Sequence, residues 1–425
     1  MAMFPMPWRR EGGIRAGGLT VTTISESDPV RTRSGLISGL GIPVLAFALS
    51  RLALLLIGLL ARDLAFVPED YVWIYDGRSW LDIWGVWDTG WFLSVMTNGY
   101  MSAVSTSPET LSQANWAFFP LYPMMAFAVA ELAGLSGFVA LLVVSNLCFL
   151  AALVWVRAET QALYGSAAAN WAVVLLCAVP GSHVFSSAYS EATFLLFIVG
   201  TLAMARQGRW LIAGGLAALS VLTKNFGVLL LAPMAVYYAQ RNFSGPLTLQ
   251  SLISGFPGSG GRGEFARFAV SLMLPCLALG GFMLFLHFRA GDFLAFATIQ
   301  SAWGRSMNLP IVALFTPLGP WLGFAGFSAY LWPSVIAGWV ALGLCIALLF
   351  KRQWAHASFC IPGMFVLLSA GILSVFRLVL PLAPLAMVAA SLMVARPKIS
   401  WVLLALIVLA EALLMWGWAL GWPIF

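Results

Sequence analysis

One short stretch of this sequence combines acidic residues with several tryptophans. It reads Asp82-Ile-Trp-Gly-Val-Trp-Asp88-Thr-Gly-Trp-Phe. A carboxylate that lies between aromatic rings, in surroundings of low dielectric, is a candidate general base. Tryptophan rings are also suitable surfaces for sugar rings and isoprenoid chains. We therefore take Asp88 as a candidate base, with Asp82, Trp87 and Trp91 as candidate substrate contacts; the alternative is an aromatic belt at a membrane surface with an incidental aspartate.

Two further stretches hold hydrogen-bonding side chains. In Phe-Phe-Pro-Leu-Tyr122-Pro, two prolines around the tyrosine indicate a rigid entry into a helix, so shaping of the fold is the alternative to substrate contact by Tyr122. In the later stretch, His183 precedes Ser-Ser-Ala-Tyr189-Ser-Glu191. So many polar groups in one loop suit a sugar or an acceptor hydroxyl, whereas the serines could instead cap a helix. His183, Tyr189 and Glu191 are therefore candidate substrate contacts.

Three basic residues, Lys224, Arg305 and Arg377, lie in or beside loops that hold few other basic residues. Arginine suits two-pronged recognition of a phosphate, and lysine serves as a point charge. The alternative is that their side chains extend to anionic lipid headgroups. Arg51 and Glu411 lie instead near the middle of apolar runs, where an ion pair between them is the simplest expectation.

The composition shows which environment must hold these residues. Apolar residues make up 61% of the chain and charged residues 9%, whereas a soluble domain carries roughly 25% charged residues. Apolar runs of the 17–25 residues that cross a bilayer recur along the chain. The five cysteines all fall inside such runs, without zinc or disulfide spacing. The sequence therefore predicts an all-α polytopic membrane protein and no nucleic-acid partner.

The apolar runs predict about eleven spans. They lie near 36–60, 138–156, 170–185, 192–205, 211–223, 226–238, 268–287, 333–350, 358–375, 378–395 and 401–420. Lys and Arg gather on the cytoplasmic side of a membrane protein, which places the acidic stretch 61–137 and the segment 288–332 outside. The run 118–134 is short and opens with prolines, so we predict an interfacial or re-entrant helix. The run 311–330 is left open.

The same reading predicts the organisation of the whole chain. Residues 1–35 are expected to form a disordered cytoplasmic tail. Residues 36–425 are expected to form one transmembrane domain, in which 61–137 is an outer catalytic loop.

Five motifs occur in a fixed order: Trp87-Asp88, Phe-Phe-Pro-Leu-Tyr-Pro123, Tyr-Ser-Glu191, Thr-Lys-Asn-Phe-Gly227 and Phe-Arg-Leu-Val-Leu-Pro381. This set resembles the PIG-V-type mannosyltransferases (GPI mannosyltransferase 2 and its prokaryotic relatives) of the GT-C membrane glycosyltransferase superfamily. The resemblance covers about residues 40–395. Relatives often carry Arg where this chain has Lys224 and Pro-Arg where it has Phe376-Arg377, so the positive charges are kept while their fine geometry can differ.

The resemblance implies a sugar donor such as mannosyl-1-phosphoryl-polyprenol, an acceptor that is a glycolipid or glycan, and catalysis at the periplasmic or lumenal face. Its single first-loop base carries over onto Asp88. An inverting transfer needs one base and cations that hold the departing phosphate, the role expected of Lys224, Arg305 and Arg377. Fixed cations can neutralise that charge, so we expect no metal and no other cofactor.

Two rival functions deserve comparison with this expectation. A lipid or glycan flippase or transporter often has repeated halves and charges along a central path, and neither is evident here. A polymerase or ligase of lipid-linked glycans would be expected to place its main polar loop late in the chain, whereas here the largest acidic loop comes first.

The predicted topology can be tested with single cysteines at Ser105 and Gln353. A membrane-impermeant thiol reagent, applied to intact cells, should label the first and spare the second, because the loops lie on opposite faces. Permeabilised cells provide the control. Equal labelling of both positions from outside would contradict the topology.

Overall fold

The computed structural model describes residues 33–65, 75, 79–102, 112–242, 261–305, 309–315 and 331–422. The chain divides into two units, Met1–Ser38 and Gly39–Phe425. The predicted tail 1–35 lies almost entirely outside the described residues, as does most of the run 311–330. All described residues from Gly39 onwards belong to the second unit.

Helices are the only regular secondary structure among the described residues, which confirms the predicted all-α class. In chain order, with η marking a 3₁₀ helix, they are α1 (Arg33–Leu64), α2 (Ser79–Asp82), α3 (Thr89–Asn98), η2 (Asn115–Ala117), α4 (Leu121–Ala133), α5 (Gly137–Tyr164), α6 (Ser166–Ala178), η3 (Ser182–Phe185), α7 (Glu191–Arg206), α8 (Trp210–Thr223), η4 (Asn225–Leu230), α9 (Leu231–Asn242), α11 (Gly261–Ala290), α12 (Ala295–Thr298), η5 (Ile299–Trp303), α13 (Pro310–Phe315), α14 (Trp332–Phe350), α15 (Trp354–Ser369), α16 (Val375–Val379), α17 (Ala383–Val394) and α18 (Pro397–Ala419).

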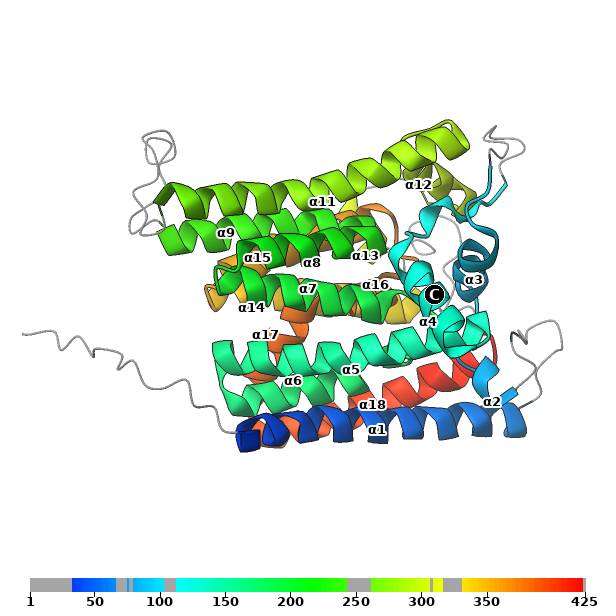
Figure 1. Cartoon of the computed structure of the whole chain (residues 1–425). Coiled ribbons are helices and arrows are strands. Elements are labelled where there is room, and N and C mark those ends of the chain that lie inside the picture. The colour runs from blue at the N-terminus through cyan, green and yellow to red at the C-terminus, as the bar shows by residue number, and fades with distance from the viewer. Residues whose placement is uncertain are drawn as a thin grey trace, which may run out of the picture. The chain divides into compact units, whose positions relative to one another are not determined.

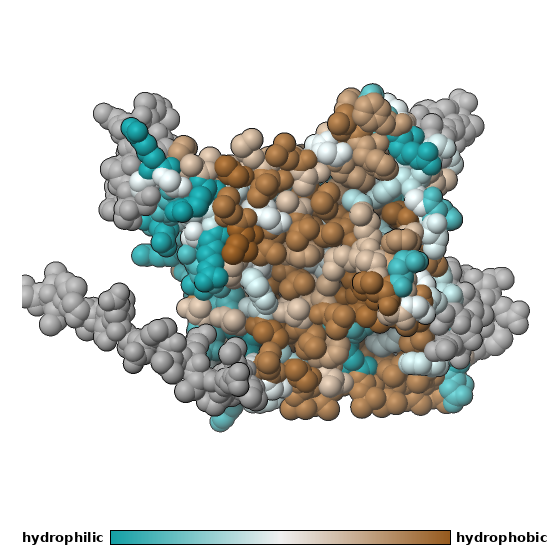
Figure 2. All heavy atoms as spheres, viewed as in Figure 1, coloured by the Kyte–Doolittle hydropathy of each residue, from teal (hydrophilic) through white to brown (hydrophobic). Residues whose placement is uncertain are grey.

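Several of these helices are long and apolar enough to cross a bilayer. They are Gly39–Leu64, Gly137–Tyr164, Gly261–Ala290, Trp332–Phe350 and Pro397–Ala419. On the face drawn in Figure 2, a broad apolar band covers the middle of the helices, and hydrophilic side chains gather near their ends. The protein is thus an integral membrane protein with several spans, as predicted.

The predicted number of eleven spans is not confirmed, because several predicted spans are shorter helices. These are Ser166–Ala178, Trp210–Thr223, Trp354–Ser369 and Ala383–Val394, and the predicted interfacial segment also holds a short helix, Leu121–Ala133. At 1.5 Å per residue, a helix of 13 residues is about 20 Å long, against a hydrocarbon core of about 30 Å. The length of α4 therefore matches the expected interfacial or re-entrant helix, while its place relative to a membrane stays a prediction.

Several predicted spans are interrupted, and in two of them the cause can be identified. The run 170–185 is α-helical only as far as Ala178 and ends in the 3₁₀ helix η3. The run 378–395 is broken between α16 and α17 at Pro381, since proline lacks the N–H that an α-helix needs at this point. Hydropathy alone does not register such breaks, because the residues around them stay apolar.

The helices of the second unit pack side by side. Figure 1 shows α5, α6, α7, α8 and α11 running along one another, with α2, α3, α4 and α12 near one end of them. The helices α8 and α11 approach closely at Gly214, where a Cβ would lie 2.5 Å from the carbonyl oxygen of Ser271. Glycine at this point allows the two backbones to touch.

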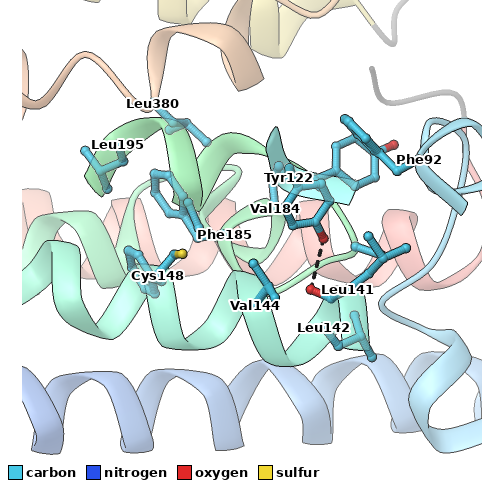
Figure 3. Close-up of a cluster of buried hydrophobic side chains, with 14 of the residues drawn as sticks. Phe92, Tyr122, Leu141, Leu142, Val144, Cys148, Val184, Phe185, Leu195 and Leu380 are labelled. Carbon is cyan, nitrogen blue, oxygen red and sulfur yellow. Dashed lines mark hydrogen bonds between the residues drawn. The ribbon is translucent and has the colours of Figure 1, made fainter. Parts of the chain in front are cut away.

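A buried apolar cluster holds the segment before α7 against α5 (Figure 3). Phe185 stacks on Phe149 with ring centroids 4.6 Å apart. Tyr122 points its hydroxyl towards α5, where it donates to the carbonyl of Leu141 at 3.0 Å and lies 2.8 Å from Ser145 Oγ. The cluster therefore joins α4, α5 and the segment that leads into α7.

Arg51 of α1 binds the loop that leaves α6. Its guanidinium donates to the carbonyls of Ser182 (2.8 Å) and Cys177 (3.1 Å), and to the hydroxyls of Ser182 (2.9 Å) and Ser186 (3.2 Å). This loop is not helical around residues 179–181, so its carbonyls need partners from other elements. One buried arginine supplies several of them.

Glu411 of α18 binds the same loop. Its carboxylate accepts from the backbone N–H groups of Gly181 (2.5 Å) and His183 (2.8 Å), from the Ser182 hydroxyl (3.2 Å), and lies 3.1 Å from His183 Nδ1. The predicted ion pair between Glu411 and Arg51 is not formed in the described part of the chain. Arg51 and Glu411 instead both bind the same loop, and their opposite charges offset each other there.

The segment after α8 turns back onto that helix, and this turn requires glycine. The N–H of Gly227 donates to the carbonyl of Lys224 at 2.9 Å. A Cβ at Gly227 would lie 2.4 Å from the backbone nitrogen of Val221 and 2.6 Å from the carbonyl carbon of Ser220. Gly227 therefore fixes where Lys224 leaves the helix.

Replacing Arg51 by methionine should lower the thermal stability of the purified protein by several degrees. The loop carbonyls would lose their donors, and each buried polar group left without a partner costs about 1–3 kcal/mol. Leu52→Ala is a matched control because Leu52 is exposed on the same helix. Equal melting of both variants and the wild type would show that the loop does not depend on Arg51.

Replacing Gly227 by alanine should also lower the melting temperature, because the backbone of the turn must move to admit the new methyl group. Gly215→Ala provides the control: Gly215 lies in α8 with no atom within 4 Å of its Cβ position. Alanine there should be neutral or stabilising, since it favours a helix over glycine by about 1 kcal/mol. A Gly227→Ala variant as stable as Gly215→Ala would contradict the close approach.

Candidate active site

An open cavity of about 120 Å³ lies beside the start of α3. Its walls combine charged, polar and aromatic side chains, namely Asp88, Phe92, Ala117, Phe118, Phe119, Ser190, Thr223, Lys224, Asn225, Phe226, Gln300, Trp303, Arg305, Arg377 and Leu378. The structure therefore brings the candidate base and all three candidate phosphate-binding residues to one cavity, although the four are far apart in the sequence.

Asp88 stands directly before α3, the position from which an aspartate usually caps a helix. Here its side chain makes no such cap and is partly exposed, at 28%. The backbone is held instead by Tyr189, whose hydroxyl donates to the carbonyl of Val86 at 3.0 Å and accepts from the Asp88 N–H at 3.1 Å. The carboxylate is thus available to the cavity.

Arg377 lies on the short helix α16 and is the nearest cation to Asp88. Its Nη1 donates to Asp88 Oδ2 at 2.7 Å, and its Nε lies 3.4 Å from Glu191 Oε1. The guanidinium carbon is 4.9 Å from the centre of the Tyr189 ring, a cation–π distance. Two acids and one aromatic face therefore define the place of this arginine.

Glu191 opens α7 and is fully buried. Its Oε1 accepts from Lys224 Nζ at 3.2 Å and also faces Arg377. The first turn of a helix favours negative charge, and the two cations offset the cost of burying a carboxylate. Burial lowers the pKa of Lys224, and the nearby Glu191 opposes this shift.

Arg305 follows η5 and completes the group of cations. It donates to Gln300 Oε1 at 3.1 Å and to Ser374 Oγ at 3.3 Å, and no described carboxylate pairs with it. Burial, and then the charge of Arg377, lower its pKa. A further anion nearby would therefore stabilise the charged form of Arg305.

The charges of the site do not balance. Lys224, Arg305 and Arg377 bring three positive charges, and Asp88 and Glu191 bring two negative ones, which leaves a surplus of one positive charge. A cavity with such a surplus, lined by two arginines and a lysine, suits a phosphate. No group of three His, Cys, Asp or Glu is placed to hold a metal ion in the described part of the chain.

Two of the predicted substrate contacts, Tyr122 and His183, lie away from the cavity. Tyr122 is fully buried in the core shown in Figure 3. His183 is also fully buried, bound to Glu411 and packed 4.8 Å from the ring of Trp418. Both act in the fold: the sequence shows that these residues are polar and close to the site in the chain, but not which way they face.

The other predicted substrate contacts surround the cavity without lining it. Asp82 is fully buried and accepts from the N–H of Tyr75 at 3.1 Å. Trp87 occupies the turn before α3 with a positive φ of 50°. Trp91 is stacked on Phe118 at 5.9 Å. Tyr189 binds the backbone of Asp88. Glu191 positions the cations, because it binds Lys224 and faces Arg377.

An aromatic wall is the part of the site that the sequence reading missed. Phe118 and Trp303 both line the cavity, with ring centroids 6.1 Å apart, and Trp303 meets Trp91 edge-on at 5.8 Å. Trp303 stands two residues before Arg305 in the sequence. An aromatic residue so close to a candidate phosphate ligand was the available signal.

Known proteins give a partial match to this chain. No curated protein sequence matches it. The structure of ArnT from Cupriavidus metallidurans bound to undecaprenyl phosphate has 16% identity and a TM-score of 0.49, over 88% of this chain and 63% of that one. An oligosaccharyltransferase from Archaeoglobus fulgidus tethered with an acceptor peptide has 14% identity and a TM-score of 0.46, over 91% of this chain and 55% of that one. The chain thus spans less than two thirds of either protein, and likenesses so distant assign no activity to it.

A family model gives the clearer result. The model described as Mannosyltransferase (PIG-V) matches residues 73–257. This segment contains Asp88, Glu191 and Lys224, whereas Arg305 and Arg377 lie beyond it. Residues 73–257 are therefore similar to the PIG-V mannosyltransferases, the family that the order of the motifs predicted.

Proposed function

We propose that this chain is an inverting glycosyltransferase, specifically a mannosyltransferase, that moves a sugar from a polyprenyl-phosphate donor to a glycolipid or glycan acceptor. The observation that carries the proposal is the meeting of one accessible carboxylate, Asp88, with Lys224, Arg305 and Arg377 around one cavity. The family match supports the choice of mannose. The outer face of the membrane is the proposed place of reaction, on the charge distribution of the loops.

The proposed reaction assigns one role to each kind of group. Asp88 accepts the proton of the acceptor hydroxyl, and the acceptor oxygen forms a bond to the anomeric carbon on the face opposite the phosphate. The bond between that carbon and the phosphate oxygen breaks, and its electron pair leaves on the phosphate. Lys224, Arg305 and Arg377 hold this developing negative charge, the kind of stabilisation that preorganised cations provide. The products are the glycosylated acceptor and the polyprenyl phosphate.

A mostly apolar surface beside the cavity supports a lipid-linked donor. It surrounds a small hollow of about 10 Å³, and its residues are Phe194, Lys224, Phe226, Leu229, Phe359, Gly363, Leu367, Leu378 and Leu382. Lys224, Phe226 and Leu378 line both spaces. A phosphate at Lys224 would therefore lie at the junction of a polar and an apolar space, which suits a headgroup attached to an isoprenoid chain.

The aromatic wall suits the sugar-binding side of the reaction. Phe118 and Trp303 line the same cavity as Asp88, and aromatic faces pack on the apolar faces of sugar rings. The cavity thus offers cations to a phosphate and aromatic rings to a sugar. A flippase of a lipid-linked sugar would also bind a phosphate and a sugar, but it would not need a base.

Replacing Asp88 by asparagine should lower kcat by about 10²–10⁴-fold, the usual share of general acid–base catalysis. The amide keeps the shape of the side chain and removes its basicity. Asp82→Asn is the matched control and should cost less, because Asp82 is buried outside the cavity. Purified variants of equal thermal stability should be assayed with a radiolabelled polyprenyl-phosphate sugar at saturating donor and acceptor.

The opposite order of losses in kcat would show that Asp88 is not the general base. If Asp88→Asn keeps most of its kcat while Asp82→Asn or Glu191→Gln abolishes turnover, the base is that other residue. If the wild-type protein transfers no sugar from any polyprenyl-phosphate donor, the proposed function itself is wrong.

A further inference from the structure

Arg377 is shared between two carboxylates that hold it in different ways. Asp88 Oδ2 accepts from its outer nitrogen Nη1 at 2.7 Å. Glu191 Oε1 faces the inner nitrogen Nε at 3.4 Å. The side chain of Asp88 is 28% exposed to the cavity, whereas that of Glu191 is fully buried. The arginine therefore has one partner that the cavity reaches and one that is enclosed by protein.

The bond to Asp88 is in conflict with the proposed role of this residue as a base. One of its two oxygens, Oδ2, is already occupied by a guanidinium N–H in a short, charge-assisted hydrogen bond. Protonation of the carboxylate would remove the charge that holds Arg377. The same guanidinium is one of the three cations proposed to bind the donor phosphate. Asp88 and the phosphate are thus two anions that both require the charge of Arg377.

Glu191 is placed to keep the arginine in position when Asp88 leaves. It anchors Lys224 as well as Arg377, and it stands at the N-terminus of a sixteen-residue helix. The ring of Tyr189 supports the guanidinium from one face. With these contacts unchanged, only the Nη1 side of Arg377 has to exchange its partner.

We propose that the donor phosphate replaces Asp88 on Arg377, so that Asp88 becomes free to act as a base only once the donor is bound. This inference rests on the proposed function. The exchange forms an arginine–phosphate bond and breaks the arginine–aspartate bond, with no proton transferred. Glu191 is then a positioning residue that holds both cations, and the acceptor is activated after the donor has bound.

The exchange predicts an unusual effect of Asp88→Asn on binding. A neutral amide competes poorly for the guanidinium, so the Kd of a polyprenyl monophosphate without sugar should fall by about tenfold, the lower end of the range for one charged hydrogen bond. Titration of purified protein in nanodiscs measures this constant. Glu191→Gln should have the opposite effect and weaken binding, because it loosens both cations.

A double-mutant cycle separates the exchange from simple charge repulsion. In an Arg377→Ala background, Asp88→Asn should bring no gain in affinity, since the nitrogen under competition is gone. A gain of the same size in that background would show that Asp88 only repels the phosphate at a distance, and it would overturn the exchange. All variants should be matched for thermal stability before titration.

The remaining outcomes are also decisive. If Asp88→Asn leaves the Kd unchanged or raises it while the wild type binds the lipid, the exchange is wrong and the proposed function stands. If the wild type does not bind a polyprenyl monophosphate at all, the proposed function and the exchange fail together.

Discussion

The structure depends on the buried charges that meet at Arg377. Burying an ion inside a protein costs several kcal/mol unless partners offset the loss of water. Arg377, Glu191 and Lys224 are largely or fully buried, so each is tolerable only while the others are within hydrogen-bonding reach. Because they come from α16, α7 and the end of α8, this requirement fixes three helix ends to within a few ångström. Asp88, before α3, joins as the partly exposed member.

Buried backbone groups need partners just as buried ions do, and this need explains why so many helices end near the cavity. Backbone that is not helical is tolerated at membrane depth only where it is buried in protein or lines a cavity. The segment between α6 and α7 is such a stretch, and Arg51 and Glu411 supply the partners that its backbone lacks. Short helices thus give the protein the backbone ends that carry its charged side chains.

Much of this arrangement could be predicted from the sequence, and the limits have physical causes. Hydropathy predicted the all-helical membrane class, because apolar length decides it. Asp88, Lys224 and Arg377 could be assigned to one site, because a surface that faces lipid would not hold charged residues at these positions. The number of spans could not be read, since a 3₁₀ turn keeps the same hydropathy as a helix. The directions of Tyr122 and His183 depend on packing between distant elements, which no local pattern records.

A structure with a bound polyprenyl monophosphate would test the central claim most directly. Cryo-electron microscopy of the purified protein in lipid nanodiscs can locate the phosphorus atom. We expect it in the cavity, in contact with Arg377 and Lys224 and close to Asp88, with the isoprenoid chain lying along the apolar residues beside Phe226. A headgroup bound at any other place on the protein, with Lys224, Arg305 and Arg377 in contact only with protein groups, would contradict the account.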